Sequence, residues 1–436
     1  MSEDNLDTLA NNTGFIERKR KITAFSFVKS LIFNAMPHNK QSLVDIKSNM
    51  LDCINENISK VAVHKKFKPE AANFMKTLLN QLMDCCLTET SKDIPLGKFS
   101  SINIKDSSKF KLPIHYQKDY PSYGSYNKQA ALMNMQFEYD LLSGSWNCIE
   151  LTKATRNDQA DSKETADDIC SNGLYIRDLG YITTTYLLAV CRKNAYFINR
   201  LPKIGVYILS EGEYKPINWT DLDKKLKKTG NSCHEIDVYL GKNEKIKCRM
   251  IIKPVPEEVS IKRIRKAAQG GKRKEGYQVS KEYKIKSRYN IFVTNVPKKT
   301  LNRQQIVDSY RLRWQIEIIF KTWKSNLQIH KMKAMKSERM ECQLIAKLIW
   351  ILINTRLHHV THLLLLEKFP DKGCSIFKFL KVMSMYPTAI LENYSKTSSF
   401  IAWFNKTIPP ILKDLSIEKR LKEESHIQIL NSVLLC

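Results

Sequence analysis

The sequence has no apolar run long enough to cross a membrane. The longest uninterrupted runs, such as residues 348–353, are far shorter than the roughly 18 residues that a spanning helix needs. The first ten residues, MSEDNLDTLA, are acidic, whereas a secretory signal has a basic segment followed by an apolar one. Together these absences predict a cytoplasmic protein.

The sequence also lacks paired cysteines of the kind that bind zinc. It has 11 cysteines but no C-x-x-C pair, and the adjacent Cys85 and Cys86 suit neither a tetrahedral zinc site nor a compact disulfide framework. We therefore expect reduced thiols that are mostly buried.

Acidic residues are few compared with basic ones. The 44 Asp and Glu residues face 71 Lys and Arg residues, which leaves a net charge of +27. Such a balance predicts a polyanionic partner, and without a spanning segment nucleic acid is favoured over a membrane. The excess is greatest between residues 242 and 288, with 16 basic residues against 5 acidic ones. Arg263, Arg265 and Lys266 are therefore candidates for DNA phosphate contacts, although a solvated basic face is the alternative.

The order of patterns along the chain predicts an α/β fold. Residues 1–98 read as a helical N-terminal domain, which either binds DNA or only packs against the rest. Strands and helices alternate over residues 99–202, with a hairpin turning near Gly144 and an acidic polar connection at 156–168. Residues 203–288 read as a β-rich basic insertion with little helix, 289–345 as the second part of the core, and 346–436 as a helical C-terminal region.

Two predicted strands each end in an aspartate. Alternation places Ile102 and Ile104 on one face with Asp106, and a second strand repeats the pattern with Asp178 after two apolar residues. Taken singly, each aspartate is more often a turn residue or helix cap than a ligand. The repetition favours a ligand site at the strand ends of an α/β sheet.

The stretch YRLRWQIEIIFKTWK, residues 310–324, reads as one largely packed helix. At 100° per residue, Tyr310, Arg313, Glu317 and Lys324 fall within about 60° of one another. This stripe is either a solvated salt-bridge ladder or a site for a metal bound to a phosphate. Carboxylates from separate elements suit a pair of Mg²⁺ ions, and Asp106, Asp178 and Glu317 would provide them. Trp314 and Trp323 are expected in the core.

The spacing Y-x2-R-x3-E-x6-K resembles the signature of bacterial insertion-sequence transposases of the DDE type, the "insertion sequence four" family. IKDSSKFKLP is similar to the strand with the family's first Asp, RDLGY to that with the second, and FVTNVP to the strand before the signature helix. The resemblance covers about residues 100–336.

The resemblance implies a ribonuclease-H-like catalytic core, with Asp106 on the first strand, Asp178 on the fourth and Glu317 on a late helix. The three acids would be catalytic and would bind two Mg²⁺ ions, for which Mn²⁺ can substitute. Tyr310, Arg313 and Lys324 would hold terminal phosphates of double-stranded DNA.

The implied reaction is cut-and-paste transposition. Water attack and a hairpin at the element end free the element, and its 3′ hydroxyl then joins target DNA. Paired terminal inverted repeats imply a homodimer in a synaptic complex on bacterial nucleoid DNA, with the helical C-terminal region as a plausible interface. Two alternatives remain: an inactive DNA-binding relic, or a ribonuclease-H-like nuclease that cuts without joining.

Two further features of the sequence have more than one interpretation. Some members of the family stack an aromatic residue on a flipped base, and Tyr289 is the candidate here, with an edge-strand tyrosine as the alternative. His358 and His362 have the spacing of a zinc-protease pair, but His359 stands where that motif requires Glu. The sequence therefore disfavours a metalloprotease.

Overall fold

The computed structural model describes most of the chain. The described residues are 2–18, 20–35, 42–54, 57–84, 98–123, 130–230, 232–271, 278–370, 372–387, 389–390, 397–417 and 428–430. Cys85, Cys86 and the basic residues 272–274 lie outside them. The cysteines that the structure describes are free thiols, of which Cys233, Cys248, Cys342 and Cys374 are buried and Cys170 is exposed.

The chain divides into two compact units. Unit 1 contains residues 1–94, 107–155 and 316–423, and unit 2 contains residues 95–106, 156–315 and 424–436. Strand β1 and helix α12 each begin in unit 2 and continue into unit 1.

Ten strands form a mixed sheet in the order β3-β2-β1-β4-β5-β10-β9-β8-β6-β7. Their bounds are β1 Ser101–Leu112, β2 Ala131–Asp140, β3 Trp146–Lys153, β4 Gly173–Arg177, β5 Tyr196–Arg200, β6 Val206–Ser210, β7 Glu213–Pro216, β8 His234–Leu240, β9 Ile246–Pro254 and β10 Tyr289–Thr294. With helices before and after the strands, this sheet confirms the predicted mixed α/β class with helical flanks.

Unit 2 is built on parallel strands that give way to antiparallel ones. Strand β4 pairs in parallel with both β1 and β5, while β10 runs antiparallel to β5 and β9. Its helices are α6 Asp158–Glu164, α7 Thr184–Arg192, α8 Trp219–Thr229, α9 Glu257–Gly271, α10 Lys281–Lys286 and α11 Arg303–Tyr310. Buried apolar residues of α7, β5, β8, β9 and β10 form one core cluster.

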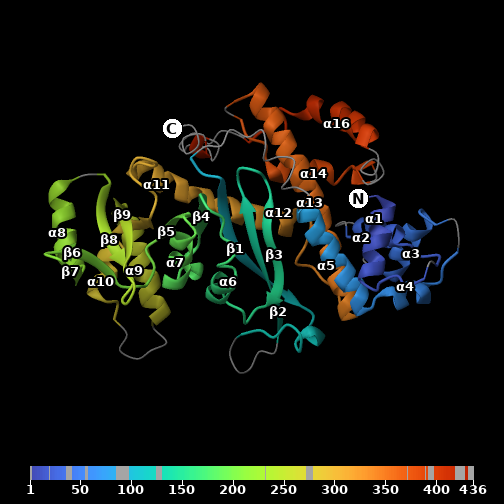
Figure 1. The fold of residues 1–436 in the computed structure, drawn as a ribbon, viewed down its shortest axis with the longest axis horizontal. Helices are drawn as coiled ribbons and strands as arrows, with labels where there is room; N and C mark the ends of the chain where they lie inside the picture. Colours follow the sequence, from blue (N-terminus) through green and yellow to red (C-terminus); the bar gives the residue numbers. More distant parts are fainter. Residues whose placement is uncertain are drawn as a thin grey trace. The chain divides into compact units, whose positions relative to one another are not determined.

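Unit 1 is mainly helical. Its helices are α1 Glu3–Asn12, α2 Ala24–Asn34, α3 Leu43–Leu51, α4 Lys60–Lys66, α5 Pro69–Asp84, α13 Ser337–Lys368, α14 Ile376–Met383 and α16 Thr397–Ile411, together with most of α12 Trp314–Asn326. Helix α5 packs along α13 (Figure 1). The hairpin of β2 and β3 turns as predicted, with Gly144 at φ +71°.

Aromatic side chains fill the core of unit 1. The ring of Phe137 on β2 lies 4.8 Å from that of Trp323 on α12, centroid to centroid, and Trp146 on β3 lies 5.2 Å from Trp323. Trp323 is 0% exposed, which confirms its predicted place in the core. Trp314 is 57% exposed, so the same prediction was wrong for it. Trp314 is the first residue of α12, and the residues before it form a 3₁₀ turn instead of continuing the α-helix.

Two predictions about local structure were wrong. Residues 203–288 are not poor in helix, since they contain α8, α9 and α10 beside strands β6 to β9. Residues of the acidic connection form helix α6, because Asn157 caps its start by accepting a hydrogen bond from Ala160 N (2.9 Å). The domain boundaries predicted from the sequence remain a proposal.

A search of the described residues for a helix long and apolar enough to span a membrane found no candidate.

Candidate active site

The two aspartates each follow the last paired residues of two neighbouring strands in unit 2. In the parallel pair of β1 and β4, Ile104 is opposite Ile176 and Lys105 is opposite Arg177. Asp106 is the next residue on β1, and Asp178 is the residue directly after β4. Because neighbouring strands are about 4.8 Å apart and side chains alternate along a strand, we expect the two side chains to leave the sheet next to each other and on the same face.

The two aspartates reach this point in different ways. Asp178 directly follows β4 and precedes the short 3₁₀ turn Leu179–Tyr181, as predicted for a strand end. Asp106 does not end its strand, because β1 continues to Leu112. The prediction of a strand end was wrong here because β1 is longer than β4: its pairing with β4 stops at Lys105, but the strand itself does not.

The signature stretch is not one helix. Helix α11 ends at Tyr310, residues Arg311–Arg313 form a 3₁₀ turn, and α12 begins at Trp314. Side chains three residues apart eclipse one another in a 3₁₀ turn. Tyr310 and Arg313 are therefore still stacked, with the Arg313 guanidinium 6.0 Å from the Tyr310 ring centroid.

Arg313 reaches the first aspartate. Its Nη1 lies 3.5 Å from Asp106 Oδ2, and the two side chains are only 15% and 21% exposed. The structure thus brings a guanidinium from the signature stretch onto the carboxylate at the end of the β1–β4 pairing. A partly buried ion pair of this kind fixes both groups more firmly than one on the open surface.

Tyr310 lies in the electrostatic field of the same groups. Burial raises the pKa of its hydroxyl to about 12, with Arg313 and Arg200 opposing the rise and Asp178 adding to it. The phenol therefore keeps its proton at neutral pH and is able to donate a hydrogen bond.

Arg200 is a residue that the sequence reasoning missed. It is the last residue of β5, its guanidinium lies 5.7 Å from the ring centroid of Phe292, and that ring is 5.2 Å from the ring of Tyr310. The one signal in the sequence was that a basic residue ends the predicted strand at residues 196–200. Its place beside Tyr310 became visible only once β5 and β10 were paired.

Glu317 and Lys324 belong to unit 1. Glu317 lies in the first turn of α12 and Lys324 in the last, and both are partly buried. Burial lowers the pKa of the Lys324 ammonium. That Glu317 joins the two aspartates, and that Lys324 acts with Tyr310 and Arg313, remain predictions.

The donor set fits a divalent ion. Mg²⁺ prefers carboxylate oxygens, and the register of β1 and β4 places two carboxylates side by side. The contact with Arg313 shows that Asp106 already takes a positive charge as a neighbour. Over the described part of the chain, no cluster of three or more His, Cys, Asp or Glu side chains is close enough to hold a metal.

The basic residues of α9 differ from one another. Arg263 is partly buried and donates to the carbonyl oxygen of Tyr289 (3.0 Å) and to Oδ1 of Asn290 (2.7 Å). Arg265 and Lys266 are exposed. The geometry therefore gives Arg263 a role within the fold and leaves the other two facing solvent.

Tyr289 is buried rather than exposed to solvent. It is 7% exposed, and its hydroxyl donates a 2.8 Å hydrogen bond to Asp223 Oδ1 on α8. The alternative of an edge-strand tyrosine was wrong, because β10 lies between β5 and β9. Stacking on a flipped base remains a prediction, and it would require this side chain to leave its pocket.

His358 and His362 on α13 hold a backbone segment in place. His358 Nε2 lies 3.1 Å from the carbonyl oxygen of Cys374, and the amide of Cys374 donates to His362 Nδ1 at the same distance.

Comparison with known proteins identifies the family of this chain. The family described as "Transposase DDE domain" matches residues 97–353, which include Asp106, Asp178 and Glu317. The chain belongs to the DDE transposases of insertion sequences. This confirms the resemblance drawn from its signature.

This transposase is similar to transposases of several bacteria. It is 33% identical to the transposase for insertion sequence element IS231B of Bacillus thuringiensis subsp. berliner, over 83% of this chain and 79% of that protein. It is 26% identical to the transposase for IS1151 of Clostridium perfringens, over 95% and 90%.

Among solved structures, the transposase is similar to the piggyBac transposase in a synaptic complex with hairpin DNA. The identity is 9% and the TM-score 0.41, over 97% of this chain and 84% of that chain. A similarity of this size supports no conclusion about site or mechanism.

Proposed function

We propose that this transposase excises an insertion sequence and joins it to new DNA by metal-dependent cut-and-paste chemistry. The observation that supports the proposal is the register of β1 and β4, whose last pair, Lys105 opposite Arg177, directly precedes Asp106 and Asp178. The 3.5 Å contact of Arg313 with Asp106 adds to this support. The first five strands would form a ribonuclease-H-like core, with the aspartates on its first and fourth strands as the family resemblance implies.

Asp106, Asp178 and Glu317 would hold two Mg²⁺ ions. When bound, these ions would activate the attacking oxygen and stabilise the leaving oxygen of a phosphodiester. The carboxylates carry the negative charge that such ions require, and no covalent bond between protein and DNA is needed.

The remaining signature residues would bind the terminal phosphates. Arg313 offers paired N–H donors that match two phosphate oxygens, and Tyr310 keeps a hydroxyl proton to donate. Lys324 would add a compact positive charge. In this arrangement Arg313 exchanges part of its contact with Asp106 for the phosphate when DNA enters.

The proposed sequence of reactions starts with attack by water at the element end. The 3′ hydroxyl freed by this cut would attack the opposite strand, which forms the hairpin and releases the flanking DNA. A second water would open the hairpin, and the regenerated 3′ hydroxyl would attack a phosphodiester of target DNA and displace a target 3′ hydroxyl. Because two ends must be joined to one target, we propose a homodimer that pairs the terminal inverted repeats. Its site of action would be the DNA of the bacterial cytoplasm.

Cleavage and joining are tested together. Purified transposase is incubated with a labelled duplex that carries the inverted-repeat end flanking its gene, a target plasmid, and either Mg²⁺ or a chelator. We expect nicked ends, hairpins and joined plasmid with Mg²⁺ alone, and none of them with Asp106→Asn. Cleavage without joined plasmid would identify a nuclease instead, and end binding without cleavage would identify an inactive relic.

A further inference from the structure

A buried cation stands directly before each aspartate. Lys105 is 0% exposed and Arg177 is 1% exposed, and the two are opposite each other in the register of β1 and β4. Because successive side chains alternate along a strand, both point to the face opposite Asp106 and Asp178. A buried cation is costly unless it is paired, so that face must supply partners.

One short helix supplies partners for both cations. Asp161 Oδ2 on α6 lies 2.6 Å from Lys105 Nζ, and both side chains are 0% exposed. Lys105 also donates to Thr165 Oγ1 at 3.3 Å. On the next residue of the helix, Ser162 Oγ accepts from Arg177 Nη1 at 3.4 Å.

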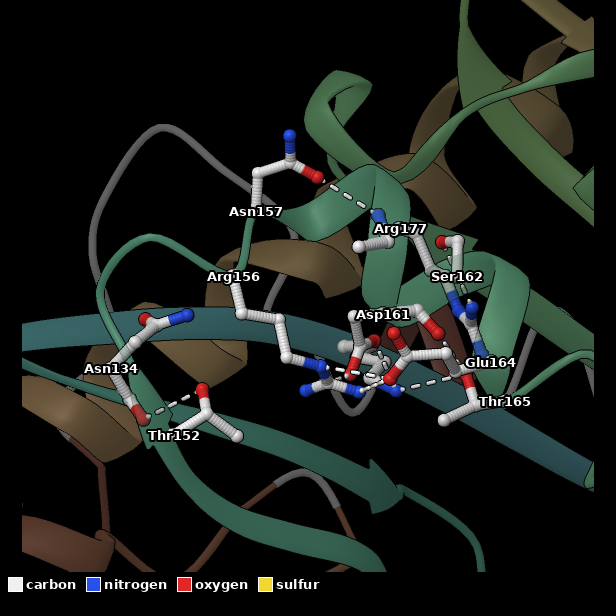
Figure 2. A network of polar contacts seen from close by, with 11 residues as sticks. Asn134, Thr152, Arg156, Asn157, Asp161, Ser162, Glu164, Thr165 and Arg177 are labelled. Carbon is white, nitrogen blue, oxygen red and sulfur yellow. Dashed lines mark hydrogen bonds and ion pairs between the residues drawn. The ribbon is translucent and has the colours of Figure 1, made fainter. Parts of the chain in front are cut away.

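Helix α6 is itself held in place. Arg156 Nη1 lies 3.1 Å from Asp161 Oδ1, and its Nη2 lies 2.7 Å from Glu164 Oε2. Figure 2 shows Arg156, Asp161 and Glu164 converging, with Ser162 and Arg177 beside them. Arg156 and Lys105 thus approach Asp161 through its two different oxygens. We call Lys105, Asp161, Ser162, Thr165 and Arg177 the α6 clamp.

The clamp is hard to explain by stability alone. A buried ion pair contributes little relative to apolar side chains of the same size, because both charges lose their hydration. What the pair does provide is a fixed geometry, since misplacing either charge is costly. In this sheet, the residues that the clamp fixes are Lys105 and Arg177, which directly precede Asp106 and Asp178.

We propose that Lys105 and Arg177 are positioning residues for the metal-binding aspartates. By tying both strands to α6, they hold β1 and β4 at the register and twist that set the two carboxylates for a shared divalent ion. The inference rests on the proposed function, and it assigns Lys105 and Arg177 no contact with metal or DNA. It predicts that loosening the clamp weakens metal binding without weakening end binding.

The main test variant is Lys105→Met/Asp161→Asn, which removes both charges of the pair and leaves Arg156 bound to Glu164. The control is Lys163→Met, which removes an exposed lysine from the same helix. For each full-length protein bound to element-end duplex, free Mn²⁺ is titrated by electron paramagnetic resonance. End affinity, unfolding midpoint in chelator and the Mg²⁺ dependence of cleavage are measured alongside.

We expect the double variant to bind Mn²⁺ about 10- to 100-fold more weakly, as when groups supporting metal ligands are removed elsewhere. High Mg²⁺ should restore part of its cleavage, while end affinity and the control stay at the wild-type values. If the double variant fails to fold, Thr165→Val and Ser162→Ala replace it, and each should weaken Mn²⁺ binding in the same direction.

Two outcomes overturn different claims. If folded clamp variants bind Mn²⁺ as tightly as the wild type, whereas Asp106→Asn does not, the positioning role is wrong and the proposed function stands. If the wild type itself neither binds Mn²⁺ on DNA nor cleaves, the proposed function fails.

Discussion

Asp106 and Asp178 each stand one residue beyond a paired position of two parallel strands. The last pair is Lys105 opposite Arg177, so the register that buries two cations on one face presents two carboxylates on the other. Adjacent parallel strands are therefore enough to bring together acids that are far apart in the sequence. The predictions below test the groups around this arrangement.

The first prediction concerns the basic face of α9. Arg265→Gln/Lys266→Gln should weaken binding to element-end DNA and reduce the slope of log affinity against log salt. Each phosphate contact contributes about 0.9 to that slope, so losing two contacts should reduce it by about 2. Fluorescence anisotropy at several salt concentrations measures the effect.

The variant Arg263→Gln is the matched control for Arg265→Gln/Lys266→Gln, because it also removes a positive charge from α9. Because its guanidinium donates to Tyr289 O and Asn290 Oδ1, its loss should lower stability and leave the salt slope close to the wild-type value. An unchanged slope in the Arg265/Lys266 variant would show that this face does not contact phosphates.

The second prediction concerns Tyr289. Tyr289→Phe removes the hydrogen bond to Asp223, which should cost about 1.5–3 kcal/mol of unfolding free energy, as for bonds to charged groups. The ring is kept, so stacking on a flipped base would survive the change. Denaturant unfolding and end cleavage measure the two roles separately, and Tyr289→Ala distinguishes them further. If the Phe variant is fully stable, the bond to Asp223 is not structural.

The third prediction concerns pH. Lys347 on α13 is 2% exposed, and its Nζ donates to Gln328 O at 3.2 Å. Burial lowers the pKa of its ammonium from 10.5 to about 8. Between these values the unfolded chain binds more protons than the folded one, so this group makes the protein more stable as pH rises.

The variant Lys347→Met tests whether Lys347 makes the protein more stable as the pH rises. Between pH 7 and pH 10, the wild type should gain about 2 to 3 kcal/mol of unfolding free energy relative to the variant. Urea unfolding of both proteins across that range gives the difference, in which other titrating groups cancel. A constant difference would mean that Lys347 titrates near its ordinary pKa.

Much of the site could be predicted from local sequence. Alternating apolar residues placed Asp106 and Asp178 on strands, and the spacing of Tyr310, Arg313 and Glu317 identified the family. These signals are local because strand alternation and family signatures both act over a few residues.

Other features depend on pairing between distant segments. The acidic run around Asp161 reads as a polar connection, since nothing nearby in the sequence shows that Lys105 will be buried against it. Arg200 is one basic residue among many until β5 and β10 pair beside Tyr310. The 3₁₀ turn at Arg311–Arg313 likewise interrupts a stretch that contains no Gly or Pro to announce the break.

The most direct test of the account is cleavage by Glu317→Gln. This change keeps the size of the side chain in the first turn of α12 but removes its charge. We predict that the variant binds element-end duplex with near wild-type affinity and makes no nicked, hairpin or joined product in Mg²⁺. Cleavage at the wild-type rate, or equal loss of binding and cleavage, would contradict a metal-binding role for Glu317 beside Asp106 and Asp178.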